Sequence, residues 1–94
     1  MRLYVSNAKK EIVPVVVDFL KLSLINLETK IVFNGTTYEG VVNEISFDNE
    51  KFDYIIFKID ENELKFNFLE ESKVRLDKGL FYFETKENTA LIYT

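Results

Sequence analysis

The residues of this sequence that are most suited to catalysis or metal binding are its carboxylates. Six of them fall in two short stretches: Asp48, Glu50, Asp53, Asp60, Glu61 and Glu63. Paired carboxylates can hydrolyse a glycosidic bond or bind a hard cation. The central glycine and terminal glutamate of an EF-hand loop are absent, however, and Asp and Asn also cap the backbone of tight turns. We therefore expect these acids to be turn and surface residues, with no bound metal.

Other catalytic chemistry is poorly represented in the chain. The sequence contains no histidine and no cysteine, which removes the commonest general base, the thiolate nucleophile and the usual transition-metal ligands. The four serines lie outside any nucleophile-elbow pattern, and three glycines form no phosphate-binding loop. The sequence predicts a protein that is not an enzyme and that uses no cofactor.

Length and composition predict one folded domain over residues 1–94. Hydrophobic residues make up 47% of the chain and aromatic residues 15%, more than a disordered chain carries. The first residues lack the apolar run of a signal peptide, and the most apolar segment, Ile12–Leu27, is interrupted by polar residues and short for a membrane span. We expect a cytoplasmic protein with no membrane contact.

The N-terminal third predicts a helix. Arg2–Val5 fits a short edge strand, and Ser6 or Asn7 could cap a helix that follows. We expect this helix over about 8–27, kinked near Pro14. The β-branched run Val15–Val17 suits a strand equally well, so periodicity alone leaves helix and strand open over residues 12–27.

From Glu28 onward the pattern is that of antiparallel strands. Asn34-Gly35 separates two extended runs and is the favoured dipeptide of a type I′ hairpin turn. Short turns between successive strands favour antiparallel neighbours. Further strands are expected at Phe52–Ile59, Glu63–Leu69, Val74–Leu76 and in a final hairpin over Leu80–Thr94.

The expected fold class is α+β, with an N-terminal helix packed on a curled antiparallel β-meander of five to seven strands. Gly40 interrupts a strand and is interpreted as a bend. The stretch TYEGVVNEISFD, Thr37–Asp48, resembles the strand after the first hairpin in Sm-like and SH3-like small barrels. The resemblance covers about residues 30–76. It implies that the sheet closes into a small barrel and, for Sm-like proteins, that the protein binds RNA.

Charge points to a different partner. Residues 39–71 contain ten acidic residues against three lysines, a net charge of −7 in a chain whose net charge is −4. An acidic hairpin surface could dock on a basic surface of another protein. The size, composition and lack of catalytic residues also resemble small proteins of phages and other mobile elements that block a host enzyme or defence complex. We expect such a non-catalytic protein-binding inhibitor. Its expected contact residues are Asp48, Glu50, Asp53, Asp60, Glu61, Glu63, Glu70 and Glu71.

Two alternatives stay open. A Sm-like, nucleic-acid-associated regulator would use the basic residues of the first third and stack bases on tyrosines; the residues concerned are Lys9, Lys10, Lys21, Lys30, Tyr38, Tyr54 and Tyr82. The acidic balance makes nucleic acid the less favoured partner. A self-associating structural protein, such as a homodimer, would use the aromatic final hairpin. The expected contacts are Phe81, Phe83, Leu91 and Tyr93.

Overall fold

The computed structural model describes residues 3–68, 72–77 and 79–94. The described chain forms one helical segment and eight strands. In sequence order these are β1 (Leu3–Ala8), a 3-10 turn η1 (Lys10–Ile12), α1 (Val13–Leu24), β2 (Glu28–Phe33), β3 (Thr36–Phe47), β4 (Tyr54–Ile59), β5 (Asn62–Asn67), β6 (Ser72–Asp77), β7 (Leu80–Glu84) and β8 (Thr89–Tyr93).

The expected α+β class, with one N-terminal helix on an antiparallel sheet, is confirmed. Seven strands follow the helix, and β1 adds an eighth before it as an edge strand. The order across the sheet is β1-β6-β7-β8-β2-β3-β4-β5. A simple meander is therefore wrong, because β5 and β6 are neighbours in sequence but lie far apart in the sheet. Instead the hairpin strands β6, β7 and β8 join the rest through the pairing of β8 with β2.

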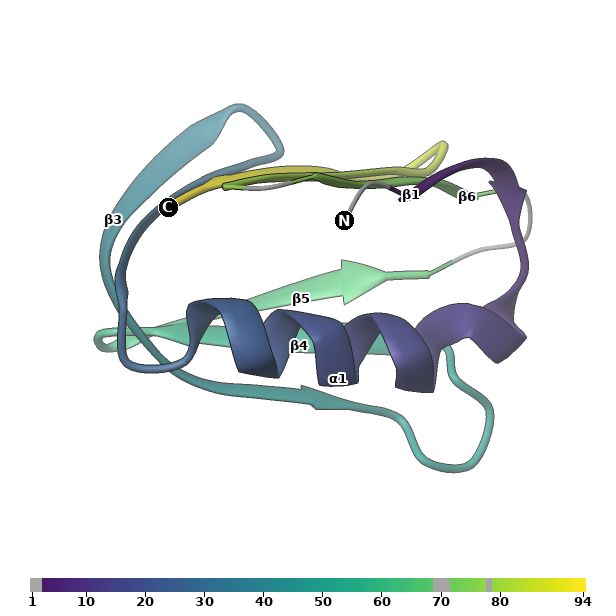
Figure 1. The fold of residues 1–94 in the computed structure, drawn as a ribbon, viewed down its shortest axis with the longest axis horizontal. Coiled ribbons are helices and arrows are strands. Elements are labelled where there is room, and N and C mark those ends of the chain that lie inside the picture. The colour runs from purple at the N-terminus through teal and green to yellow at the C-terminus, as the bar shows by residue number, and fades with distance from the viewer. Residues whose placement is uncertain (1–2, 69–71, 78) are drawn as a thin grey trace.

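The expectation of a closed barrel is also wrong. Among the described residues, no pairing joins the two edge strands β1 and β5. The sheet folds over on itself instead, with β1, β6 and β8 in one layer, β4 and β5 in the other, and β3 running between them (Figure 1). Helix α1 lies along the open side. Its buried apolar face is made of Val13, Val16, Val17, Leu20 and Leu24. The helix therefore covers the side of the core that further strand pairing would close in a barrel.

The helix is shorter than expected. Ala8 lies in β1, where it pairs with Ser72, so the helical segment begins at Lys10. Pro14 is in the first turn of α1, where its missing N–H leaves no helical hydrogen bond unmade, and the helix begins there without a kink. It ends at Leu24, because Asn26 has a left-handed backbone (φ 67°) and its N–H donates to the carbonyl of Val42 at 2.9 Å.

The predicted Asn34-Gly35 hairpin is confirmed. Both residues have positive φ, 49° and 84°, between β2 and β3. Asn34 has a second role, because its side-chain oxygen accepts the N–H of Thr89 at 2.9 Å and its own N–H donates to the carbonyl of Thr89 at 2.9 Å. The same turn thus also holds the start of β8.

Strand β3 turns the corner between the two layers at Gly40. Up to Val41 it pairs with β2, and from Val42 it pairs with β4, with a register shift between Val42 and Glu44. The carboxylate of Asp60 accepts the N–H of Val41 at 3.0 Å, and a Cβ on Gly40 would lie 2.0 Å from that carboxylate. Gly40 therefore lies just before the change of partner strand, and its lack of a side chain makes room for Asp60.

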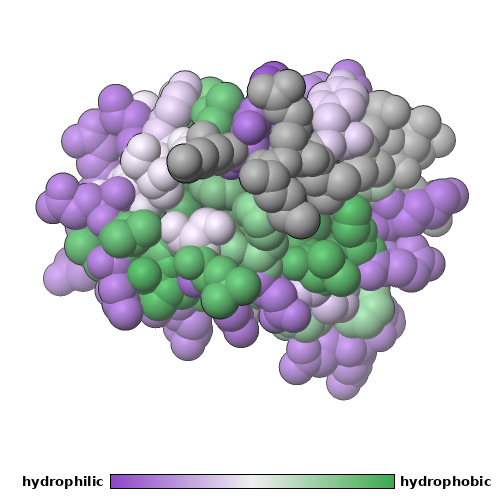
Figure 2. Space-filling model, in the orientation of Figure 1, coloured by the Kyte–Doolittle hydropathy of each residue, from purple (hydrophilic) through white to green (hydrophobic). Residues whose placement is uncertain are grey.

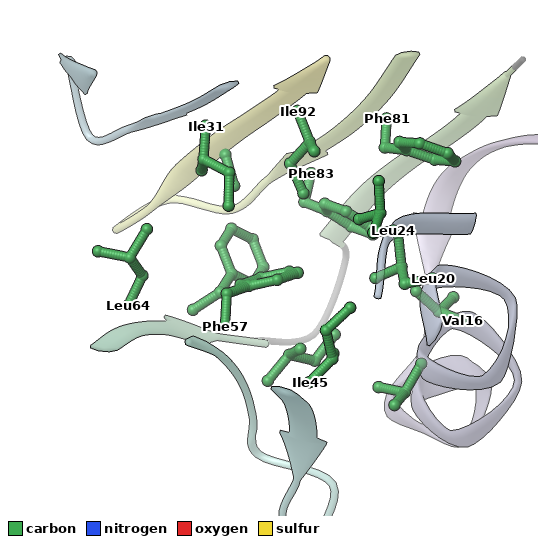
Figure 3. Close-up of a cluster of buried hydrophobic side chains, with 14 of the residues drawn as sticks. Val16, Leu20, Leu24, Ile31, Ile45, Phe57, Leu64, Phe81, Phe83 and Ile92 are labelled. Carbon is green, nitrogen blue, oxygen red and sulfur yellow. The ribbon is translucent and has the colours of Figure 1, made fainter. Parts of the chain in front are cut away.

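The core lies between the two layers and the helix (Figure 3). Ile31, Phe83 and Ile92 point inward from the layer that contains β2, β7 and β8, and Ile45 and Phe57 face them from the other layer. The rings of Phe57 and Phe83 lie 6.4 Å apart, centre to centre. A second buried ring, Phe66, lies 5.8 Å from Phe83, so aromatic contacts join the layers directly.

A double-mutant cycle tests the corner. Gly40→Ala should lower the free energy of unfolding by about 1–3 kcal/mol, since the added methyl overlaps Asp60. Asp60→Gly removes the carboxylate and suits the positive φ of 50° at that position, so it should cost about 1 kcal/mol for the lost hydrogen bond. In the Asp60→Gly background, Gly40→Ala should cost much less. Urea unfolding of the four proteins measures the coupling.

Gly35→Ala is the matched control. Gly35 also needs a positive φ, but a Cβ there meets nothing within 4 Å. Its cost should be the same with and without Asp60→Gly. Equal costs for Gly40→Ala in the two backgrounds would contradict the close-approach explanation.

Candidate protein-binding surfaces

The two groups of acidic turn residues do not form one surface. The turn at 48–53 joins β3 to β4 near Tyr54, and the turn at Asp60 follows Ile59 at the opposite end of β4. Figure 1 shows these turns at opposite ends of the molecule. The bend of the sheet lies in β3 and not in β4, so folding of the sheet does not bring the two turns together.

Most acids of the first turn have partners within the chain. Asp48 accepts the N–H of Glu50 at 3.0 Å, and this hydrogen bond is the main reason why the pKa of the Asp48 carboxyl lies below its usual 3.8. Asp53 forms an ion pair with Lys10 at 2.5 Å, which ties this turn to the start of the helical segment. Glu50 is exposed. Asp48 and Asp53 thus hold local structure, and Glu50 is open to a partner.

The second turn divides in the same way. Asp60 is committed to the corner of β3, where its carbonyl oxygen also accepts from the side-chain amide of Asn43 at 3.1 Å. Glu61 and Glu63 are exposed. The expected contacts Glu70 and Glu71 lie outside the described residues.

The outer side of α1 carries an apolar ridge that the sequence analysis did not single out. Ile12, Val15, Phe19 and Leu22 follow one another at steps of three, four and three residues, which places them on one side of a helix. Val15 is 65% exposed and Leu22 is 90% exposed. Figure 2 shows hydrophobic side chains gathered on the face of the molecule that carries α1, with hydrophilic ones around them. In the sequence, the spacing of these four residues is that of a second apolar stripe, which lies opposite the buried stripe of the helix.

The apolar ridge has an acidic border. Glu11 and Asp18 are both exposed and seven residues apart, so they lie on the same side of the helical segment, about 40° and 60° from Val15 at 100° per residue. The Lys10–Asp53 ion pair holds the acidic 48–53 turn against the N-terminal end of the helical segment, which also carries Glu11. The ridge therefore combines exposed apolar surface with negative charge along one side.

The outer face of the strands β1, β6, β7, β8 and β2 is a second apolar surface. Tyr4 is 62% exposed and Tyr93 is 40% exposed. Half-buried side chains continue the surface between them: Val32, Leu80, Tyr82 and Leu91. We call these six residues the outer sheet face. An open groove of about 660 Å³ runs beside Tyr93, with Val32 and Thr37 in its lining.

The expected self-association residues divide between two sides of the sheet. Leu91 and Tyr93 belong to the outer sheet face. Phe81 and Phe83 point the other way, into the core, and are 2% and 0% exposed. Alternation within each strand separates Phe81 and Phe83 from Tyr82, but the register of the hairpin decides which residues of β8 share their side. The observed partner of Leu91 is Tyr82.

The residues expected to bind nucleic acid are dispersed. Lys10 is paired with Asp53, and Lys30 with Glu39 at 3.4 Å. Tyr38 packs against the core, and Tyr54 lies under the ammonium group of Lys65. Tyr82 donates its hydroxyl to Glu84 at 2.7 Å, which raises the pKa of Tyr82 to about 12.

The described residues contain neither a metal-binding cluster nor a membrane-spanning helix. No group of three or more His, Cys, Asp or Glu side chains there could hold a metal ion. No described helix is long and apolar enough to cross a membrane. Comparison with known proteins gives no family model, no curated protein and no solved structure that matches this chain.

The role of Asp48 predicts a pH dependence. Because its pKa is lowered in the folded protein, its contribution to stability is complete above pH 3.8 and is lost as the pH falls through the lower, folded value. Asp48→Asn keeps an oxygen acceptor for the turn but does not titrate. Urea unfolding between pH 2 and 7 should show a shallower loss of stability in acid for Asp48→Asn than for wild type. The same slope in both proteins would contradict this role; Glu61→Gln, at an exposed position, is the control.

Proposed function

We propose that this protein is a non-catalytic protein-binding module that docks through the apolar ridge of α1 and its acidic border. The observation that carries the proposal is Leu22, which is 90% exposed in the last turn of a helix whose opposite side is buried. Single exposed apolar residues are common on protein surfaces. Here Leu22 lies on the same side of the helix as the exposed Val15, with the half-buried Phe19 between them, and apolar surface that is exposed over neighbouring residues is typical of binding sites.

Burial of this ridge can support binding. Covering one leucine or valine side chain fully contributes about 1.5–3 kcal/mol. Val15 and Leu22 have most of that area still exposed. A groove that receives both would gain a substantial part of the binding free energy from two side chains, as the few strongest residues of protein interfaces do.

Charge specifies the kind of surface that fits. Glu11 and Asp18 border the apolar ridge, and Glu50 lies in the turn tied to the same end of the helix. A partner with an apolar groove and basic residues along one side would complement both features and associate faster. This retains the expected docking on a basic surface and moves its centre to the helix. A binder of this kind that covers a working surface of a host enzyme or defence complex would act as an inhibitor.

Affinity capture with matched variants tests the proposal. The bait is the purified protein, immobilised and exposed to lysate of its native host, with bound proteins identified by mass spectrometry. A specific protein captured by wild type should be lost with Val15→Asp/Leu22→Asp and weakened at least tenfold with Glu11→Lys/Asp18→Lys. Both pairs lie on the surface, so thermal unfolding should change little. Glu61→Lys/Glu63→Lys, at the far end of β4, is the control and should bind as wild type does.

The nucleic-acid alternative gives a different result. In fluorescence anisotropy with labelled single-stranded RNA and DNA, we expect no binding at 150 mM salt. Tight binding that falls steeply with salt and is lost with Lys9→Glu, Lys10→Glu, Lys21→Glu and Lys30→Glu combined would replace protein binding by a nucleic-acid-associated role. Capture that survives Val15→Asp/Leu22→Asp would contradict the proposed surface.

A further inference from the structure

We propose that the outer sheet face binds a second copy of this chain, giving a two-fold symmetric dimer with its sheets face to face. The face belongs to the layer opposite α1, and it points away from the helix (Figure 1). This inference is independent of the proposed function, because the apolar ridge and the outer sheet face share no residue.

The outer sheet face is regular because the strand register aligns its side chains in rows. Arg75, Tyr82, Leu91 and Val32 lie side by side across four strands. In the neighbouring row, Asp77, Leu80, Tyr93 and Lys30 lie side by side in the same way. The middle of each row is apolar or aromatic. The second row has a charged residue at both ends, and the first row has one, Arg75, at one end.

These rows are self-complementary under a two-fold axis that runs along the strands between β7 and β8. Such an axis places β7 over β8 and β6 over β2 of the second copy. In the central row, Tyr82 then faces Leu91 of the second copy. In the neighbouring row, Leu80 faces Tyr93, and Asp77 faces Lys30, of the second copy. Aromatic and aliphatic groups meet in the middle, and opposite charges meet at the edge, as stacked sheets require.

The charge of the face distinguishes a second copy from other occupants. The strands β2, β3, β6 and β7 direct three basic and four acidic residues outward on this layer: Lys30, Lys73, Arg75, Glu28, Glu39, Asp77 and Glu84. The net charge of −1 is small for a chain that carries −4. Two copies can therefore meet here with little repulsion, whereas phosphates would find no excess of positive charge.

The area of the face predicts a reversible dimer. The layer has six strands when the start of β3 is added to β1, β6, β7, β8 and β2. Six strands about 4.8 Å apart, with about five residues each at 3.3 Å, make a rectangle of roughly 24 by 17 Å. Two such faces bury on the order of 800 Å² as flat surfaces and more with their side chains, which is toward the low end of specific interfaces. We therefore expect dissociation constants in the micromolar range.

Sedimentation equilibrium between about 1 and 500 µM tests the proposal on the purified full chain. Wild type should change from monomer to dimer across this range. Leu91→Asp should weaken the dimer at least tenfold, and Tyr93→Glu, at a more exposed position, should do the same if Leu91→Asp lowers stability. Leu22→Asp changes the apolar ridge and should dimerise as wild type does.

A charge exchange tests the orientation of the two copies. Asp77→Lys and Lys30→Asp should each weaken the dimer, and the double variant should restore it, because each site then faces its opposite charge on the second copy. The contacts within one chain, Arg75 with Asp77 and Lys30 with Glu39, are not restored by the exchange, so recovery reports on the dimer alone.

A protein that stays monomeric at 500 µM, or a dimer lost with Leu22→Asp and kept with Leu91→Asp, would overturn the proposal. A dimer that the double variant does not restore would overturn this two-fold arrangement.

Discussion

The architecture depends on one strand belonging to both halves of the sheet. Because β3 pairs with β2 up to Val41 and with β4 from Val42 on, the angle at this corner sets the spacing of the two layers. That spacing decides whether Phe57 and Phe83 can touch and whether α1 fills the open side. Asp60 fixes the corner by bonding the backbone of Val41, and this uses a carboxylate that its exposure alone would assign to solvent. A surface residue here controls how the core closes.

The elements that the sequence specified well are those determined by near neighbours. Asn34-Gly35 defines its hairpin because both positions need positive φ, and the alternation around Leu64 and Phe66 defines a half-buried strand. The order of strands was beyond such reasoning, because the β1–β6 and β2–β8 pairings join distant segments and leave no local pattern. The barrel expectation failed for the same reason, since it took the nearest-neighbour meander as complete.

The candidate surfaces show a similar limit. Exposure of the acids at 60–63 followed from turn chemistry, but their distance from the turn at 48–53 depended on which strand bends. The apolar ridge could not be predicted, because Val15–Val17 fitted a strand as well as a helix. Without a helix, the exposed apolar stripe cannot be told apart from the buried one. Once the segment is a helix, the same residues divide into a buried face and an exposed one. The protein then has two apolar surfaces of different charge, one bordered by acids and one nearly balanced.

The pairing of β8 with β2 also bears on how the chain folds during synthesis. Residues 89–93 follow β2 to β5 in the chain, and the pairings of β2 to β5 join strands that are neighbours in sequence, so these hairpins can form before β8 is available. The layer that covers Phe57 and Phe66 arrives last. Until then the nascent chain carries an uncovered aromatic face and an unpaired edge on β2, the kind of intermediate that molecular chaperones recognise. The pairing of the final hairpin with β2 is thus the step that covers the aromatic face and removes the unpaired edge.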